Sequence, residues 1–116
     1  MWIGIVTLFP QMFSSIEDFG VLGLAVKNGS IELEFFNPRD YALDNYKRVD
    51  DYSYGGGPGM VLKFETLERA TQQAKKRANA GTRVILMSPQ GETFIQSKAQ
   101  ELSSEKSLIF VCGRYE

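Results

Sequence analysis

The chain has 116 residues and a formal net charge of −1, and its 43% hydrophobic and 23% charged residues are ordinary for a globular domain. This balance excludes a disordered tail, a coiled coil and a strongly basic domain that coats nucleic acid by charge alone. Histidine is absent and Cys112 is the single cysteine, which excludes a disulfide framework, a zinc site built on these residues and histidine-dependent nucleophile systems. No apolar run approaches the ~20 residues of a membrane helix, and the start lacks the basic region of a signal peptide, so we expect a soluble, cytoplasmic protein.

Segments with the patterns of strands and helices alternate along the chain. Four segments are predicted to be strands, the first, third and fourth of them buried on both faces: residues 2–9, 31–36, 82–87 and 107–112. Helices are predicted between them, short ones at residues 10–19 and 21–27 and longer ones at 63–80 and 94–102. This order predicts an α/β fold with a mainly parallel sheet flanked by helices.

The region at residues 37–59 breaks this pattern, because it has little apolar periodicity and is predicted to be a long loop of the kind that is usually functional. It contains a string of small residues that lets a ligand approach the backbone, at Gly55, Gly56, Gly57, Pro58 and Gly59. The string matches neither the Walker phosphate loop nor the dinucleotide fingerprint, and a floppy connection is the alternative. The preceding Asp50 and Asp51 have the residue type of a metal ligand or a base, although such pairs more often cap a helix or pair with an arginine.

Two of the predicted strands, at residues 82–87 and 107–112, are each followed by a segment of site-forming residues. These segments are Ser88-Pro89-Gln90-Gly91 and Gly113-Arg114-Tyr115-Glu116. Because ligands of open α/β sheets bind beyond the carboxyl ends of the strands, we expect the two segments to lie side by side and cradle a small molecule. Taken singly, the alternatives are a strand-to-helix turn and a solvated surface turn. The chain stops on the second segment, so we expect it to be the N-terminal part of a longer protein.

Several strings, taken together and in order, resemble the bacterial tRNA (guanine-N1)-methyltransferases (TrmD), a family of the SPOUT class. The matching strings are Met1–Ile5, Leu8–Pro10, Met12–Phe13, Ala25–Gly29, Pro38–Asp40, Val49–Asp51, Tyr54–Met60, Ser88–Gly91 and Val111–Glu116. Each is weakly specific alone, but their joint order over essentially the whole chain is highly specific. The resemblance implies a SPOUT-type, trefoil-knot fold in which residues 1–116 are the N-terminal part of one S-adenosylmethionine-dependent methyltransferase domain, truncated before the knot is complete.

The resemblance also implies a reaction and its site. A methyl group would pass from S-adenosylmethionine to N1 of the guanine 3′ of the tRNA anticodon, in a homodimer with its site at the subunit interface. The implied cofactor-binding residues are Ser88, Pro89, Gln90, Gly91, Gly113, Tyr115 and Glu116. The residues implied on the tRNA side are Asp50, Gly55, Gly56, Gly57, Pro58, Gly59 and Arg114. The catalytic base is implied to lie beyond Glu116, with Glu116 and Arg114 as candidate assistants; no metal ligand is implied, and magnesium is a candidate ion that the sequence does not show.

Two other functions stay open on the residues themselves. A non-catalytic, flavodoxin-like nucleotide-binding module would account for the α/β order and the glycine-rich loops equally well. A purely structural piece of a larger chain would expose a sheet edge and self-associate. From the resemblance, we expect this chain by itself to lack methyltransferase activity, because the knot, the base and an RNA-binding domain are incomplete in it.

Overall fold

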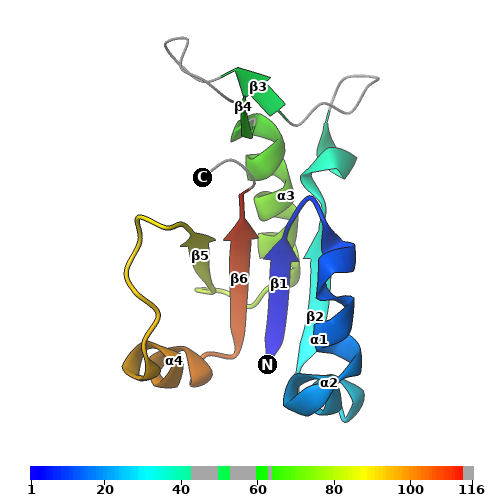
Figure 1. Cartoon of the computed structure of the whole chain (residues 1–116), viewed down its shortest axis with the longest axis vertical. Helices are drawn as coiled ribbons and strands as arrows, with labels where there is room; N and C mark the ends of the chain where they lie inside the picture. The colour runs from blue at the N-terminus through cyan, green and yellow to red at the C-terminus, as the bar shows by residue number, and fades with distance from the viewer. Residues whose placement is uncertain (43–49, 53–59, 63, 114–116) are drawn as a thin grey trace.

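A four-stranded parallel sheet forms the centre of the computed structural model, which describes residues 1–42, 50–52, 60–62 and 64–113 (Figure 1). In spatial order the strands are β2 (Glu32–Phe36), β1 (Trp2–Val6), β6 (Ser107–Cys112) and β5 (Arg83–Met87). Each neighbouring pair is parallel, so the predicted sheet is confirmed. The carboxyl ends of all four strands therefore meet at one edge of the sheet.

The longest helix, α3 (Phe64–Arg77), covers one face of this sheet and packs on β1, β2 and β6. Ala70 and Ala74 lie one helical turn apart and are fully buried. Their small side chains let the helix approach Val6 and Ile109, which are fully buried in the same cluster. The three- and four-residue spacing that predicts a helix in this segment therefore marks the face that packs on the sheet.

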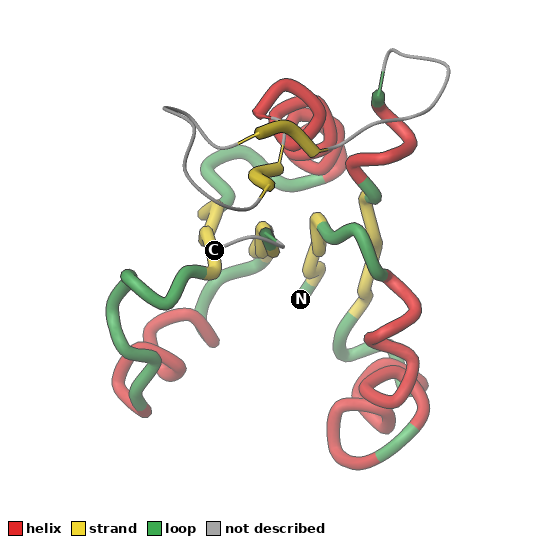
Figure 2. Tube along the Cα trace, turned by 45° about the horizontal axis from the view of Figure 1, so that its top comes forward, coloured by secondary structure: helices red, strands yellow, loops and turns green. Residues whose placement is uncertain are grey.

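The shorter helices lie on the opposite face. The chain passes from β1 to β2 through η1 (Pro10–Phe13), α1 (Ser14–Asp18) and α2 (Gly20–Lys27), and from β5 to β6 through α4 (Gln96–Ser103). Figure 2 shows α3 on one side of the strands and the α1–α2 pair and α4 on the other. Within the described part of the chain, every helix is too short or too polar to cross a lipid bilayer.

The strand β5 differs from its prediction, because it is not buried on both faces. It is an edge strand, and α3 packs on the other three strands of the sheet. Val84 and Leu86 share a face with their partners Ile109 and Val111, yet they are 41% and 56% exposed. An apolar run predicts a strand, but it does not say how far the covering helix extends across the sheet. The predicted strand is confirmed and its two-sided burial is wrong.

The predicted long loop contains regular structure. It includes η2 (Pro38–Tyr41), whose start is capped by the Asn37 side chain, which accepts a hydrogen bond from the Arg39 N–H at 3.0 Å. It also includes β3 (Asp50–Tyr52), which pairs antiparallel with β4 (Met60–Leu62). Aspartate is depleted in strands, so β3 lacks the composition that would have predicted it.

Trp2 occupies the space beside Gly4 on the face covered by α3. Its indole packs edge-on against Phe36, with ring centroids 6.3 Å apart, and its N–H donates to Glu34 Oε1 at 3.2 Å. A Cβ atom on Gly4 would lie 2.5 Å from Cη2 of that indole. The glycine therefore allows the close approach of the ring, and any side chain at this position must displace it.

Gly4→Ala is accordingly expected to lower the free energy of unfolding by about 1–3 kcal/mol, because it overpacks a closely packed site. Urea unfolding followed by circular dichroism measures the change. In a Trp2→Leu background the indole is absent, and the same substitution should cost less than about 1 kcal/mol. An equal cost in both backgrounds would show that the indole is not the obstacle.

Candidate functional site

The two site-bearing segments begin side by side. β5 and β6 are parallel neighbours whose last paired residues are Met87 and Cys112. Ser88 and Gly113 follow directly, so both segments start at the same edge of the sheet, as the sequence predicts. Gly113 is partly buried there. The remaining residues of the second predicted segment, Arg114, Tyr115 and Glu116, lie outside the described residues.

The first segment forms a tight turn. The Ser88 side-chain Oγ accepts a hydrogen bond from the Gln90 N–H at 3.1 Å, and the Ser88 carbonyl accepts one from the Gly91 N–H at 3.2 Å. Pro89 lies between them, where its fixed φ suits a turn and its missing N–H costs no hydrogen bond. Pro89, Gln90 and Gly91 are exposed. The local hydrogen bonds therefore fix the shape of the turn while leaving its surface available to a ligand.

A cavity of about 480 Å³ lies where β5, this turn and α4 meet. Its lining is mixed, with Ser88 and Gly91 from the turn, Lys98 from α4, and Phe94 and Met87 among the apolar residues. Small-molecule sites typically have volumes of roughly 300–1,000 Å³, apolar walls and a few polar groups. The cavity therefore has the size and the mixed lining of a small-molecule site.

A second hollow, between α2 and the sheet, differs in chemistry. Its volume is about 240 Å³, and its lining residues, which include Ile5, Leu22 and Phe110, are all apolar apart from Cys112. It lacks the polar groups that would orient a charged cofactor, and we assign it to packing. Cys112 is half-buried, and this burial raises the pKa of its thiol. The thiol is therefore protonated at neutral pH, which fits a packing residue rather than a nucleophile.

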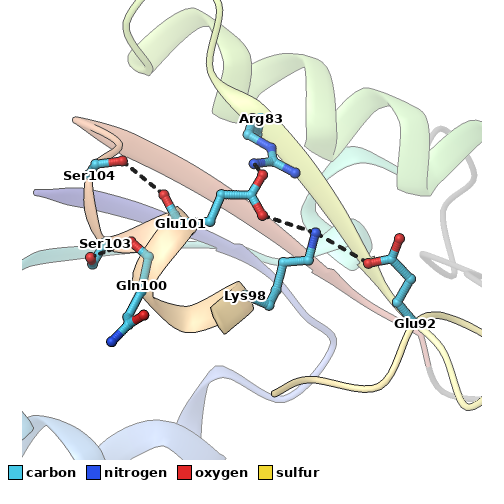
Figure 3. A network of polar contacts seen from close by, with 7 residues as sticks. All are labelled: Arg83, Glu92, Lys98, Gln100, Glu101, Ser103 and Ser104. Carbon is cyan, nitrogen blue, oxygen red and sulfur yellow. Dashed lines mark hydrogen bonds and ion pairs between the residues drawn. The ribbon is translucent and has the colours of Figure 1, made fainter. Parts of the chain in front are cut away.

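Four charged side chains form a network (Figure 3), and three of them, Arg83, Glu92 and Lys98, are part of the lining of the cavity. Lys98 Nζ is 3.2 Å from Glu92 Oε2 and 3.2 Å from Glu101 Oε2, and Glu101 Oε1 accepts a hydrogen bond from Arg83 at 3.0 Å. The hydrogen bond with Glu101, followed by that with Glu92, raises the pKa of Lys98, and the hydrogen bond with Lys98 is the main cause of the lowered pKa of Glu101. The Lys98–Glu101 pair is thus ionised at neutral pH. It is lost as the pH falls through the lowered pKa of Glu101 or rises through the raised pKa of Lys98.

Sequence reasoning missed this network. The three-residue spacing of Lys98 and Glu101 within a predicted helix is the one local signal for it. Glu92 lies in the loop before the helix and Arg83 lies in a strand, so their part in the network depends on the fold.

The residues predicted on the tRNA side are described only in part. Asp50 begins β3, opposite Leu62 of β4. In Figure 1 this pair of strands lies at the top of the molecule, beyond the carboxyl ends of the sheet strands. Ser88 and Gly113 lie at the same ends. Gly55, Gly56, Gly57, Pro58 and Gly59 lie outside the described residues. Among the residues that are described, no three acidic or cysteine side chains gather as a metal site would require.

Comparison with known proteins extends this picture. The family model of tRNA (guanine-1)-methyltransferase TrmD matches residues 1–116. The chain belongs to this family. A crystal structure of tRNA (m1G37) methyltransferase from Aquifex aeolicus superposes with a TM-score of 0.86 at 32% identity, covering 100% of this chain and 52% of that one. The predicted SPOUT-type α/β fold is therefore confirmed.

Relatives in the family are longer than this chain. The tRNA (guanine-N(1)-)-methyltransferase of Pseudoalteromonas translucida is 53% identical over 116 residues, which are 100% of this chain and 46% of the relative. The Shewanella amazonensis protein of the same name is 52% identical with the same coverage. The chain thus spans about half the length of the relatives it matches, which is consistent with the predicted N-terminal portion.

Proposed function

We propose that the native polypeptide containing residues 1–116 transfers a methyl group from S-adenosylmethionine to N1 of the guanine 3′ of the tRNA anticodon, in the cytoplasm. The match of the TrmD family model to the whole chain carries this proposal. The adjacent ends of β5 and β6 support it, because they bring together the starts of the two segments in which the family resemblance predicts cofactor binding. The alternative, a flavodoxin-like nucleotide-binding module, is not favoured by these comparisons.

In this proposal, residues 1–116 are the N-terminal part of one methyltransferase domain. The turn Ser88, Pro89, Gln90 and Gly91 is one wall of the cofactor site, and Gly113, Tyr115 and Glu116 form the next. The cavity beside the turn supports this assignment, because it combines apolar walls with residues of the turn itself, Ser88 and Gly91. Asp50, Gly55, Gly56, Gly57, Pro58, Gly59 and Arg114 face the tRNA. The site is completed by a second subunit of a homodimer and by a trefoil knot formed with polypeptide beyond Glu116.

The work left to the protein follows from the chemistry of the donor. Bound S-adenosylmethionine supplies a sulfonium methyl group that is already electrophilic, so the chain's main task is alignment. Holding two reactants in the right geometry can lower a barrier by about 7–11 kcal/mol, and in this proposal the turn at Ser88–Gly91 contributes to that alignment. Removal of the N1 proton needs a positioned base. We propose that this base lies beyond Glu116, with Glu116 and Arg114 assisting.

Methyl transfer by the native polypeptide tests the proposal. With labelled S-adenosylmethionine and an unmodified tRNA transcript carrying guanine 3′ of the anticodon, nuclease digestion should release N1-methylguanosine. A transcript with adenine at that position should yield none, and residues 1–116 alone should be inactive. A parallel reaction with EDTA reads out any magnesium requirement. Binding of FMN without any response to S-adenosylmethionine would instead support the nucleotide-binding module.

A further inference from the structure

The turn at Ser88–Gly91 continues into a return segment, residues 92–95, that has little packing of its own. All four side chains of this segment are exposed, those of Phe94 and Ile95 by 67% and 56%. A backbone hydrogen bond of 3.1 Å from the Ala99 N–H to the Ile95 carbonyl ties only its far end to α4. The hydrogen bonds inside the turn fix its shape, but not its position over the sheet. That position depends on contacts between the segment and the rest of the molecule.

Lys98 makes such a contact from the first turn of α4. Its ammonium group bridges Glu92 of the return segment and Glu101 one turn further along the helix (Figure 3). The second carboxylate oxygen of Glu101 accepts a hydrogen bond from Arg83. Arg83 begins β5, where it pairs with Leu108 of β6. A continuous chain of alternating charges thus runs from the return segment, through α4, to the sheet.

Lys98 is the link on which this chain depends. Its side chain is 28% exposed, against 80% for Glu92, and both side chains line the cavity that Ser88 and Gly91 also line. Without Lys98, Glu92 keeps no ion-pair partner within the described part of the chain, whereas the Glu101–Arg83 pair stays intact. A change at Lys98 therefore removes the ion pair of the return segment and leaves the attachment of α4 to the sheet in place.

We propose that Lys98 is a positioning residue for the methyl-donor site: through Glu92 it holds the Ser88–Gly91 turn over the cavity at the ends of β5 and β6. This inference rests on the proposed function. Lys98 acts through Glu92 and the turn, and not on the methyl group, so its loss weakens donor binding and leaves the transfer step unchanged.

Two substitutions in the native polypeptide test this role. Lys98→Met and Glu92→Gln should each raise the KM for S-adenosylmethionine by about two- to fivefold, the range of an exposed ion pair, with kcat changed less than about twofold. One substitution lowers the net charge and the other raises it. Loss of positioning raises KM in both, whereas a direct effect of charge on the cationic donor shifts KM in opposite directions and would overturn the inference.

Matched controls accompany these variants. Lys98→Arg keeps the bridge and should retain the native KM. Lys106→Met removes an exposed lysine just before β6, at the opposite end of the sheet, and should leave the KM unchanged. An equal rise in KM for Lys106→Met and Lys98→Met would assign the effect to overall charge and refute the positioning role.

Hydrogen exchange adds a readout that needs no ligand. In Lys98→Met and Glu92→Gln, the amides of residues 91–95 should exchange faster while those of β6 keep their protection. Faster exchange together with a raised KM supports the inference, and unchanged exchange or an unchanged KM in both variants overturns it. Absence of donor binding and methyl transfer in the unsubstituted polypeptide is a separate result, which overturns the proposed function.

Discussion

Replacing Ile109 by alanine is expected to lower the free energy of unfolding by about 2–5 kcal/mol, the usual range for large-to-small changes in a closely packed core. Ile109 has no exposed surface and lies in β6, an inner strand of the sheet. It belongs to the same buried cluster as Val6, Ala70 and Ala74. The alanine side chains of α3 are too short to fill the space that the isoleucine leaves, so a cavity remains. The cost of this cavity adds to the free energy lost with the buried apolar surface.

Urea unfolding of the native polypeptide, followed by circular dichroism, measures this loss. Ile109→Val removes a single methylene group and should cost only about 0.5–1.5 kcal/mol. Ile95→Ala makes the same chemical change at a side chain that is 56% exposed, and it should stay within about 0.5 kcal/mol of the native value. If Ile95→Ala proved as costly as Ile109→Ala, burial in the cluster with α3 would not explain the cost of losing Ile109.

The core around Ile109 could be predicted from the sequence for a physical reason. Strands covered by helices on both faces carry continuous apolar runs, and the run at residues 107–112 proved to be the inner strand β6. Since β5 carries a similar run, composition alone could not distinguish an inner strand from an edge strand. Val84 and Leu86 are exposed because of the place of β5 in the sheet, which is decided by strand order.

The candidate site, like the core, was predictable in its topology but not in its side-chain contacts. Parallel topology follows from the alternation of strands and helices, and it brings Ser88 and Gly113 to one edge without further information. The chain of charges through Lys98 was not predictable in this way. It joins a loop residue, two helix residues and a strand residue, and their proximity depends on how α4 packs after the turn.

Replacing Gly113 by valine is expected to weaken binding of S-adenosylmethionine by about five- to 150-fold. Gly113 is partly buried and directly follows Cys112. Cys112 pairs with Met87, the residue before Ser88, so Gly113 lies beside the start of the Ser88–Gly91 turn. In the proposed site Gly113 belongs to one wall, so a valine there adds bulk to that wall where the donor would bind. Overpacking of this kind costs about 1–3 kcal/mol, and 1.4 kcal/mol corresponds to a factor of ten in affinity. Calorimetric titration of the native polypeptide with S-adenosylmethionine measures the loss.

Gly81→Val separates this effect from a general loss of stability. Gly81 precedes β5 at the opposite end of the strand and has a φ of +78°, with open space around the position of a Cβ atom. Valine there is strained by about 1–2 kcal/mol in the left-handed region, so the unfolding free energy should fall while the donor affinity of the folded protein stays native. Gly113→Val should show the reverse, with near-native unfolding and lost affinity. Native affinity in a folded Gly113→Val protein would remove Gly113 from the cofactor site and leave the Ser88–Gly91 turn as its only described wall.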